Sequence, residues 1–435
     1  MTVKNMERKG EYAMKKRIVT LLLTMGVSAS IFVGGCATNE ESTTSQTTAG
    51  REESSREAGT ETVDNAQTVA LATNAAAVST ERTYTLTTPE YKDSYEYEGW
   101  DEDDTMITLN GSEAVADGSG VEISDGIIKI TEKGTYVFSG SYNGQIYVET
   151  QESVHIILNG VEITNESGPA IYIADAKNAY IGLAPGTENI LSDGSNYVLE
   201  DGEDEPDACI FSADDLIING SGSLTVNGNY ACGIRSKDDL VIREGTIKVT
   251  AVSDALKGKD LVCIYDGTID LSAGGCGIKA TNTDEDDKGD VYIAGGEITI
   301  ETKDDCVHSN RNVQIIGATL TLSSDDDGIH ANEVTMINSA TVTVEKSYEG
   351  IEGSIVDLIE SVVTVMASDD GINAAGDLNE TEDSGDSWGR RGGMMEDSNP
   401  DNIIYIDGGS VYVNADGDGV DSNGYIYIFG GDVTI

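Results

Sequence analysis

"SSDDDGIHANEVTMINSATVTV", residues Ser323 to Val344, contains the features that decide the fold. Three aspartates precede a Gly-Ile pair, and apolar residues alternate with polar ones toward the end of the stretch. A close copy of its first part, "ASDDGINAAG", returns at Ala367. Alternation with a period of two, broken by Gly and Asn, is typical of short β-strands separated by turns. The recurrence predicts a repeat protein.

The repeat becomes visible when each copy is aligned on the apolar residue that follows a small one. These anchor residues are Ile210, Ile234, Leu256, Ile278, Val307, Ile329, Ile351, Ile372 and Val420. They lie about 22 residues apart, and the two long intervals contain the polar inserts 282–290 and 377–402. Each copy holds three short segments of β pattern, and no segment after Ala37 has a convincing helical period. Such a repeat indicates the coil of a parallel β-helix, which is stable only when coils stack.

We therefore predict an all-β, right-handed parallel β-helix over residues 207–435. Residues 84–206 have related but less regular strand patterns, which indicate an N-terminal cap and the first coils. Leucine-rich repeats have a similar length, but their leucine pattern is missing here, and a β-sandwich would need hairpin turns. The last copy stops at Ile435 within its third strand, so we expect that further coils and a cap are missing from the C-terminus.

Residues 1–36 resemble a bacterial lipoprotein signal. Basic residues 15–17 precede an apolar run, and "VGGC" ends at Cys36, with Val33 in place of the usual Leu. The resemblance implies a lipid on Cys36 and an anchor at the extracellular face of the bacterial cell membrane. An ordinary cleaved signal peptide or a short membrane span is the alternative. Residues 37–83 contain no aromatic side chain and are rich in Thr, Ser, Glu and Ala, which predicts a disordered tether.

The charge of the chain narrows its partners. With 78 acidic against 26 basic residues, the formal net charge is -52. Repulsion between polyanions disfavours nucleic acid, and it also disfavours anionic membrane surfaces as partners except through the lipid anchor. Divalent cations are the natural complement.

Doubled aspartates recur in one register of the repeat. Equivalent residues of stacked coils lie about 4.8 Å apart, so each position of the repeat forms a physical row. The doubled aspartates lie two and three positions before the anchors: Asp304, Asp305, Asp326, Asp327, Asp369 and Asp370. Stacked carboxylates repel each other, and Ca²⁺, which prefers six to eight oxygen ligands, removes that repulsion. The row predicts calcium sites, and the alternative is a set of turns closed by Asx hydrogen bonds.

A second row lies one position after the anchors and contains basic or potentially basic residues. We call it the basic stripe: Arg235, Lys257, Lys279, His308 and His330. These side chains point outward if the anchors point inward. Beside calcium, they suit an anionic sugar polymer whose carboxylates contact both. The alternative is that the stripe only neutralises the neighbouring aspartates.

Other chemistry is less clearly indicated. Besides Cys36 the chain has five cysteines, an odd number without zinc-site spacing, so we expect small buried side chains: Cys209, Cys232, Cys263, Cys276 and Cys306. No nucleophile with an adjacent base and no Gly-rich phosphate loop is recognisable.

Several phrases carry a family resemblance. They are "GPAIYI", "ACIFSADDLIINGSGSLTVNGNYACGIRSKDDLVI", "SYEGIEG", "SDDGINAAG" and "GDGVDSNGYIYIFGGDVTI". From about Thr105 to Ile435 the chain resembles the clostridial family of exported, calcium-binding β-helix proteins that bind cellulose and polygalacturonate. The resemblance implies a pectate-lyase-like fold in a carbohydrate-binding domain. Cys232 and Cys276 stand where copies of the family more often carry Asp.

We therefore expect a surface lipoprotein that binds an acidic polysaccharide and cellulose with Ca²⁺, and that binds rather than catalyses. No catalytic residue is assigned. The alternative is a calcium-dependent polysaccharide lyase, in which Lys257 or Lys279 removes the C5 proton if burial lowers its pKa. Exposed lysines beside aspartates should instead keep a high pKa. A self-associating scaffold is a third class.

Overall fold

The computed structural model describes residues 82–199, 202, 204–375 and 399–435. The expected lipoprotein signal with Cys36, the tether up to residue 81 and most of the insert 377–402 lie outside these residues. Within the described part, the only helical element is the 3₁₀ turn η1 (Asp93–Tyr95). No helix there has the length and apolar character that a membrane crossing needs.

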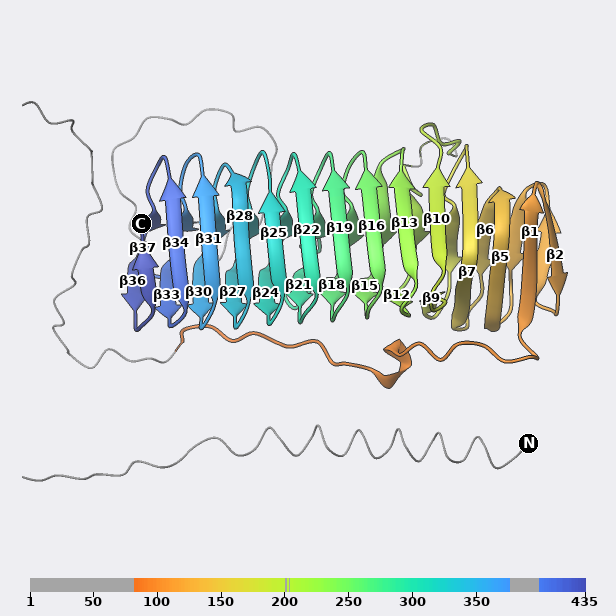
Figure 1. Cartoon of the computed structure of the whole chain (residues 1–435), viewed down its shortest axis with the longest axis horizontal. Helices are drawn as coiled ribbons and strands as arrows, with labels where there is room; N and C mark the ends of the chain where they lie inside the picture. Colours follow the sequence, from red (N-terminus) through yellow and green to blue (C-terminus); the bar gives the residue numbers. More distant parts are fainter. Residues whose placement is uncertain (1–81, 200–201, 203, 376–398) are drawn as a thin grey trace, which may run out of the picture. The chain divides into compact units, whose positions relative to one another are not determined.

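The described chain is a parallel β-helix, as the repeat predicted (Figure 1). Each regular coil contributes one strand to a 13-stranded sheet and two strands to a 24-stranded sheet. We call these the narrow sheet and the wide sheet. One coil, for example, consists of β14 (Cys232–Ser236) in the narrow sheet, followed by β15 (Asp239–Ile242) and β16 (Thr246–Ala251) in the wide sheet.

In the narrow sheet, the strands follow each other in chain order. They are β3 (Val121–Ser124), β4 (Ile127–Ile130), β6 (Gln145–Glu149), β8 (Ile171–Asp175), β11 (Ala208–Ser212), β14, β17 (Leu256–Gly258), β20 (Ile278–Ala280), β23 (Val307–Ser309), β26 (Ile329–Ala331), β29 (Ile351–Gly353), β32 (Ile372–Ala374) and β35 (Val420–Ser422).

The wide sheet has two rows. The first row is β9 (Ala179–Leu183), β12 (Leu216–Asn219), β15, β18 (Leu261–Ile264), β21 (Asp290–Ile293), β24 (Asn312–Ile316), β27 (Val334–Asn338), β30 (Ile355–Ile359), β33 (Ile403–Asp407) and β36 (Tyr425–Ile428). The second row is β10 (Glu188–Asp193), β13 (Ser223–Gly228), β16, β19 (Thr268–Ala273), β22 (Glu297–Thr302), β25 (Thr319–Ser323), β28 (Thr341–Ser347), β31 (Val362–Ala367), β34 (Ser410–Ala415) and β37 (Asp432–Thr434).

The N-terminal coils are less regular. Strands β1 (Thr105–Gly111), β5 (Gly134–Asn143) and β7 (Val154–Asn165) pair in parallel, and the long β7 pairs with β9 through its first half and with β10 through its second. Strand β2 (Glu113–Asp117) forms an antiparallel hairpin with β1, and β3 pairs antiparallel with β4. Coils therefore begin well before residue 207.

All nine predicted anchors occupy one row of the narrow sheet. Each pairs with the next in parallel register, from Ile210 with Ile234 to Ile372 with Val420. The first eight are fully buried. Ile278 still pairs with Val307 across the insert 282–290, so this polar loop leaves the core undisturbed.

The small residue before each anchor is required by the packing of the core. At Gly328 an added Cβ would lie 2.5 Å from the carbonyl oxygen of Gly350 and 2.9 Å from a methyl group of Val344. Ala255 and Cys306 occupy the same position in other coils and are fully buried. The position therefore accepts little more than a hydrogen, a methyl or a thiol, which explains the small-apolar phrase of the repeat.

Residues 82–104, which we call the strap, differ from the expected N-terminal cap. They run along the outside of the first row of the wide sheet (Figure 1). Arg82 forms two bonds of 2.6 and 3.0 Å with Asp357 of β30, whereas Asn219 of β12 donates to the carbonyl of Tyr95 at 3.1 Å. Tyr84 and Leu86 pack on apolar side chains of β27, β30 and β33. The strap thus buries the outer face of this row, which explains its continuous apolar pattern.

Candidate functional site

The basic stripe forms one continuous row on the outer face of the narrow sheet. Strand pairing places its five residues on the consecutive strands β14, β17, β20, β23 and β26. Their side chains are partly exposed, because the neighbouring anchors point into the core. The predicted register of the stripe is therefore the observed one.

The row two positions before the anchors, which we call the inner carboxylate row, joins successive coils. Four aspartates of this row accept a hydrogen bond from the backbone N–H of the equivalent residue in the next coil. The bonds run from Cys276 to Asp254 (3.0 Å), from Asp327 to Asp305 (3.1 Å), from Glu349 to Asp327 (3.2 Å) and from Asp418 to Asp370 (2.7 Å). One oxygen of each of these aspartates therefore forms a hydrogen bond between coils. The bond resembles an Asx bond, but it runs along the axis of the solenoid.

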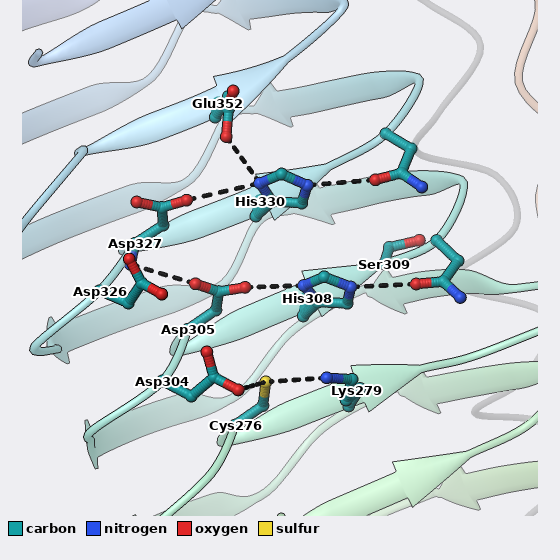
Figure 2. A network of polar contacts seen from close by, with 12 residues as sticks. Cys276, Lys279, Asp304, Asp305, His308, Ser309, Asp326, Asp327, His330 and Glu352 are labelled. Atoms are coloured by element: carbon teal, nitrogen blue, oxygen red, sulfur yellow. Dashed lines mark hydrogen bonds and ion pairs between the residues drawn. The ribbon is translucent and has the colours of Figure 1, made fainter. Parts of the chain in front are cut away.

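The other oxygen of Asp254, Asp305 and Asp327 contacts the stripe residue that lies three positions later in the chain. Asp254 pairs with Lys257 at 2.9 Å, and Asp305 pairs with Nδ1 of His308 at 2.7 Å (Figure 2). A spacing of three residues allows these pairs because the chain passes from the turn onto the strand at the small residue and the anchor between them. The inner row thus neutralises much of the stripe, which agrees with the alternative considered for these cations.

His330 is bound by carboxylates of two coils. Its Nδ1 lies 3.4 Å from Asp327 and 2.6 Å from Glu352 of β29, and its Nε2 lies 3.1 Å from the amide oxygen of Asn332 (Figure 2). Burial alone would lower the pKa of His330, but the hydrogen bonds with Asp327 and Glu352 raise it to about 11. His330 is therefore an imidazolium that donates from both ring nitrogens.

Lys279 differs from the other members of the stripe because Cys276 replaces an inner carboxylate. Its Nζ lies 3.6 Å from the sulfur of Cys276. Within the described part of the chain, no carboxylate lies within 4.0 Å of this ammonium group, whereas Arg235 pairs with Glu205 and Asp207 at 2.6 Å each. Burial would lower the pKa of Lys279, but its contact with Cys276 and the charges of Asp254 and Asp304 raise it. This lysine is a cation with an open partner position.

The outer carboxylates lie one position earlier, at the edge of the same turn. Asp304, Asp305 and Asp326 offer oxygens that lie within 4.8 Å of one another, and Figure 2 shows them on neighbouring coils. Burial, followed by the charges of Asp327, Asp305 and Asp304, raises the pKa of Asp326 to about 6. The pKa of Asp305 is lowered, because the hydrogen bond and charge of His308 outweigh its burial. The cluster is an oxygen-only donor set in which Asp305 is paired with His308, whereas Asp304 and Asp326 form no ion pair with a described residue.

The six predicted metal ligands are not all equivalent. Asp304, Asp305 and Asp326 come together, and Asp327 lies in groups with His330 and with Glu349 and Glu352. Among the described residues, Asp369 and Asp370 join no such group, and one oxygen of Asp370 is bonded to Asp418. Glu349 and Glu352 were not assigned as metal ligands from the sequence. In "SYEGIEG", Glu349 has the register of the inner carboxylate row and Glu352 has that of the stripe. Burial and the charges of neighbouring carboxylates raise the pKa of Glu349 to about 7.

The cysteines of the described chain are buried and unpaired, as expected: Cys209, Cys232, Cys263, Cys276 and Cys306. Burial raises the pKa of Cys276 above its ordinary value, so its thiol stays protonated and donates toward Asp304 at 3.3 Å. Cys276 also belongs to a group with Asp305 and His308. Because such sulfur and nitrogen ligands suit softer metals, that group is a poor calcium site.

Comparison with known proteins shows which family has this architecture. A family model described as carbohydrate-binding domain-containing protein matches residues 124–386, more than half of the chain. The chain belongs to this carbohydrate-binding domain family. A curated carbohydrate-binding domain-containing protein from Acetivibrio thermocellus is 44% identical over 136 residues, which cover 30% of this chain and 48% of the relative. The chain thus spans about half the length of that relative.

A solved structure is similar to this carbohydrate-binding domain over a longer stretch. It is described as the polysaccharide lyase-like protein from C. thermocellum, as a gadolinium derivative. The two chains are 40% identical with a TM-score of 0.53, and the match covers 53% of this chain and 96% of the other.

Proposed function

We propose that this carbohydrate-binding domain binds an acidic polysaccharide, of the polygalacturonate type, through Ca²⁺ held by Asp304, Asp305 and Asp326. The observation that carries the proposal is the convergence of these three carboxylates, of which only Asp305 is paired with a cation, His308. Burial and then the neighbouring carboxylates raise the pKa of Asp326, and a divalent cation relieves the repulsive part of this effect.

The donor set fits calcium. All three ligands are carboxylate oxygens, and Ca²⁺ accepts six to eight oxygens in flexible geometry, so uronate groups and water can complete its shell. Asp326 is exposed, which leaves an approach from solvent.

Lys279 supplies the second contact of the proposed site. Cys276 lies between it and the cluster, 3.6 Å from the ammonium group and 3.3 Å from a carboxylate oxygen of Asp304. A uronate carboxylate that bridges Ca²⁺ and Lys279 gains a charged hydrogen bond without displacing an ion pair of the fold. We include the rest of the stripe as a weaker electrostatic contribution, since its cations are already paired.

Isothermal titration with polygalacturonate tests the proposal, in Ca²⁺ and in EGTA. We expect binding heat in Ca²⁺, its loss in EGTA, and its loss in the double variant Asp304→Asn, Asp326→Asn. The matched control is Asp325→Asn, because Asp325 is adjacent in the chain but pairs with Lys346. Equal heats with and without EGTA, or no heat in either, would contradict the calcium site.

Elimination by a polysaccharide lyase is the second candidate, favoured by the description of the solved relative. The raised pKa of Lys279 counts against it, because a protonated lysine does not remove a proton at neutral pH. Incubation with pectate and Ca²⁺ decides between the two. An ultraviolet absorbance increase that disappears in Lys279→Ala identifies a lyase, and a flat trace with retained binding supports the binding function.

The proposal also keeps the surface location inferred from the lipoprotein-like signal. We propose that Cys36 carries the lipid and that the domain acts at the outer face of the membrane. Labelling of cells with a radioactive fatty acid tests this. We expect label in the wild-type protein and none in Cys36→Ser, and label in both contradicts lipidation at this residue.

A further inference from the structure

Three side chains of different chemistry converge between two coils of the narrow sheet. Cys276 lies in the turn before β20, Asp305 lies in the turn before β23, and His308 lies on β23. Their sulfur, oxygen and nitrogen ligand atoms lie within 4.8 Å of one another. Cys276 is fully buried, Asp305 is 6% exposed, and His308 is partly exposed. The group is therefore an enclosed set of mixed donors, and no linear motif marks it because its members come from two coils.

The histidine and the carboxylate of this group are oriented by hydrogen bonds to other residues. The amide nitrogen of Asn310 donates to the carbonyl of Thr281 at 3.0 Å, so its amide oxygen accepts from Nε2 of His308, at 3.0 Å as well. Nδ1 is therefore the nitrogen that faces Asp305, at 2.7 Å. The second oxygen of Asp305 accepts the N–H of Asp327 at 3.1 Å. Histidines that bind metals usually donate their other N–H to such an acceptor, which fixes the ring.

The charges around Cys276 are those that a metal-bound thiolate needs. Without metal, the thiol donates toward Asp304 at 3.3 Å, and Lys279 lies 3.6 Å from the sulfur (Figure 2). A divalent metal displaces the thiol proton and any proton on Nδ1 to solvent and binds the sulfur as a thiolate. Lys279 then gains an anionic partner. The thiolate, Asp304 and Asp305 together balance the charges of the metal and the lysine, so no further counter-ion is required.

We propose that Cys276, Asp305 and His308 bind a divalent metal of the zinc type. Asp304 supplies a fourth ligand. Zn²⁺ binds thiolate at about 2.3 Å and imidazole or carboxylate at about 2.0 to 2.2 Å in tetrahedral geometry, which places neighbouring ligand atoms about 3.3 to 3.6 Å apart. The sulfur of Cys276 and the oxygen of Asp304 already have this separation, 3.3 Å. Nδ1 of His308 and the oxygen of Asp305 move apart by about 0.6 Å as the metal replaces the proton between them. Calcium, in contrast, takes oxygen ligands.

Cys232 is a natural comparison, because it has the same register in an earlier coil. Its sulfur lies 4.0 Å from a carboxylate oxygen of Asp254 in the next coil. The stripe residue of that coil is Lys257, which pairs with Asp254 at 2.9 Å, so a cation stands where the other coil has an imidazole. Among the described residues, Cys232 belongs to no group of three metal-ligating side chains. The histidine therefore distinguishes the proposed site from an ordinary buried cysteine.

Titration of the reduced, metal-free protein with Co²⁺, without Ca²⁺ or sugar, tests the site. Every protein is full-length and carries Cys36→Ser, so only the five other thiols can respond. Co²⁺ accepts the same ligands as Zn²⁺, and a thiolate ligand gives it a charge-transfer band in the near ultraviolet. We expect this band at one equivalent of metal, its loss on addition of Zn²⁺ but not of Ca²⁺, its loss in Cys276→Ser, and its retention in Cys232→Ser. No band in the starting protein, or a band that survives Cys276→Ser, overturns the proposal.

The affinity for Zn²⁺, measured by calorimetry, tests the other ligands. His308→Ala and Cys276→Asp should each bind at least tenfold more weakly. Cys276→Asp introduces the residue type that the row already has at Asp254 and Asp305, so this variant should fold, and its thermal unfolding without metal checks that it does. Asp326→Asn should bind Zn²⁺ like the starting protein, because it removes a ligand of the proposed calcium site only.

Equal zinc affinities in all variants, or a loss confined to Asp326→Asn, would assign the metal to exposed carboxylates and overturn the proposal. The inference does not rest on the proposed function. Because Ca²⁺ and sugar are absent from both experiments, failure of the polysaccharide site would leave their results unchanged.

Discussion

Substitutions of Asp305 can separate two roles of the inner carboxylate row, which are to join successive coils and to supply negative charge. One of its oxygens accepts the N–H of Asp327 at 3.1 Å, and the other accepts from His308 at 2.7 Å. Asp305→Ala removes both acceptors. A buried N–H without a partner costs about 1 to 3 kcal/mol, and a charged hydrogen bond contributes about 1.5 to 3 kcal/mol. Because His308 is partly exposed, we use the lower half of the second range and expect a loss of about 2.5 to 5 kcal/mol in the free energy of unfolding.

Asp305→Asn removes only the charge. Its amide oxygen still accepts the N–H of Asp327, so this variant should lose about 1.5 to 2 kcal/mol, which is clearly less than the alanine variant. Urea unfolding in EGTA measures the difference, and amide exchange at Asp327 localises it. Asp325→Ala is the exposed control and should unfold like the wild-type protein. If the Ala and Asn variants lose equal stability and protect the Asp327 amide equally, the reasoning about the row is refuted.

Three further predictions concern other parts of the chain. The pKa of Asp326 is raised to about 6, so its favourable contribution to stability is complete below its ordinary pKa and is lost as pH rises through about 6. Without Ca²⁺, the midpoint of unfolding should therefore fall less between pH 4 and 7 in Asp326→Asn than in the wild-type protein. Parallel curves for the two proteins would contradict this. Arg82→Ala leaves the fully buried Asp357 without its cation, although the hydroxyl of Tyr84 still donates to it, and should cost about 3 kcal/mol in the free energy of unfolding. Amide exchange should quicken in β30 and β33 but not in β12. Gly328→Ala forces a methyl against Gly350 and should cost about 1 to 3 kcal/mol in urea, whereas Gly430→Ala, with 3.6 Å of clearance, should be neutral.

The stacking of coils could be predicted because every coil repeats the same physical requirement. Ile329 must fill the core, and Gly328 must leave room for Val344, so the phrase returns wherever the coil returns. Alignment of the phrases then gave the correct neighbours along each row. The insert 282–290 did not obscure the register, because it enters at a turn.

The partners within a row could not be predicted in the same way. The spacing of Asp305 and His308 allows an ion pair, but whether the second oxygen bonds to the next coil depends on the direction of the side chain. The aromatic residues Tyr147 and Tyr172 of the same row were missed because the alignment of anchors began at Ile210, although Ala170-Ile171 repeats the small-apolar phrase. The strap was missed because Arg82 meets Asp357 across 275 residues and no local period marks such a contact.

The strap also fixes the order in which a force applied at Arg82 would act on the solenoid. Arg82 contacts Asp357 of β30 and Asp407 of β33, whereas Tyr95, later in the strap, contacts Asn219 of β12. A pull on Arg82 would therefore load the C-terminal coils first and the contact with β12 next. Strand β1, which follows the strap in the sequence, would be loaded last.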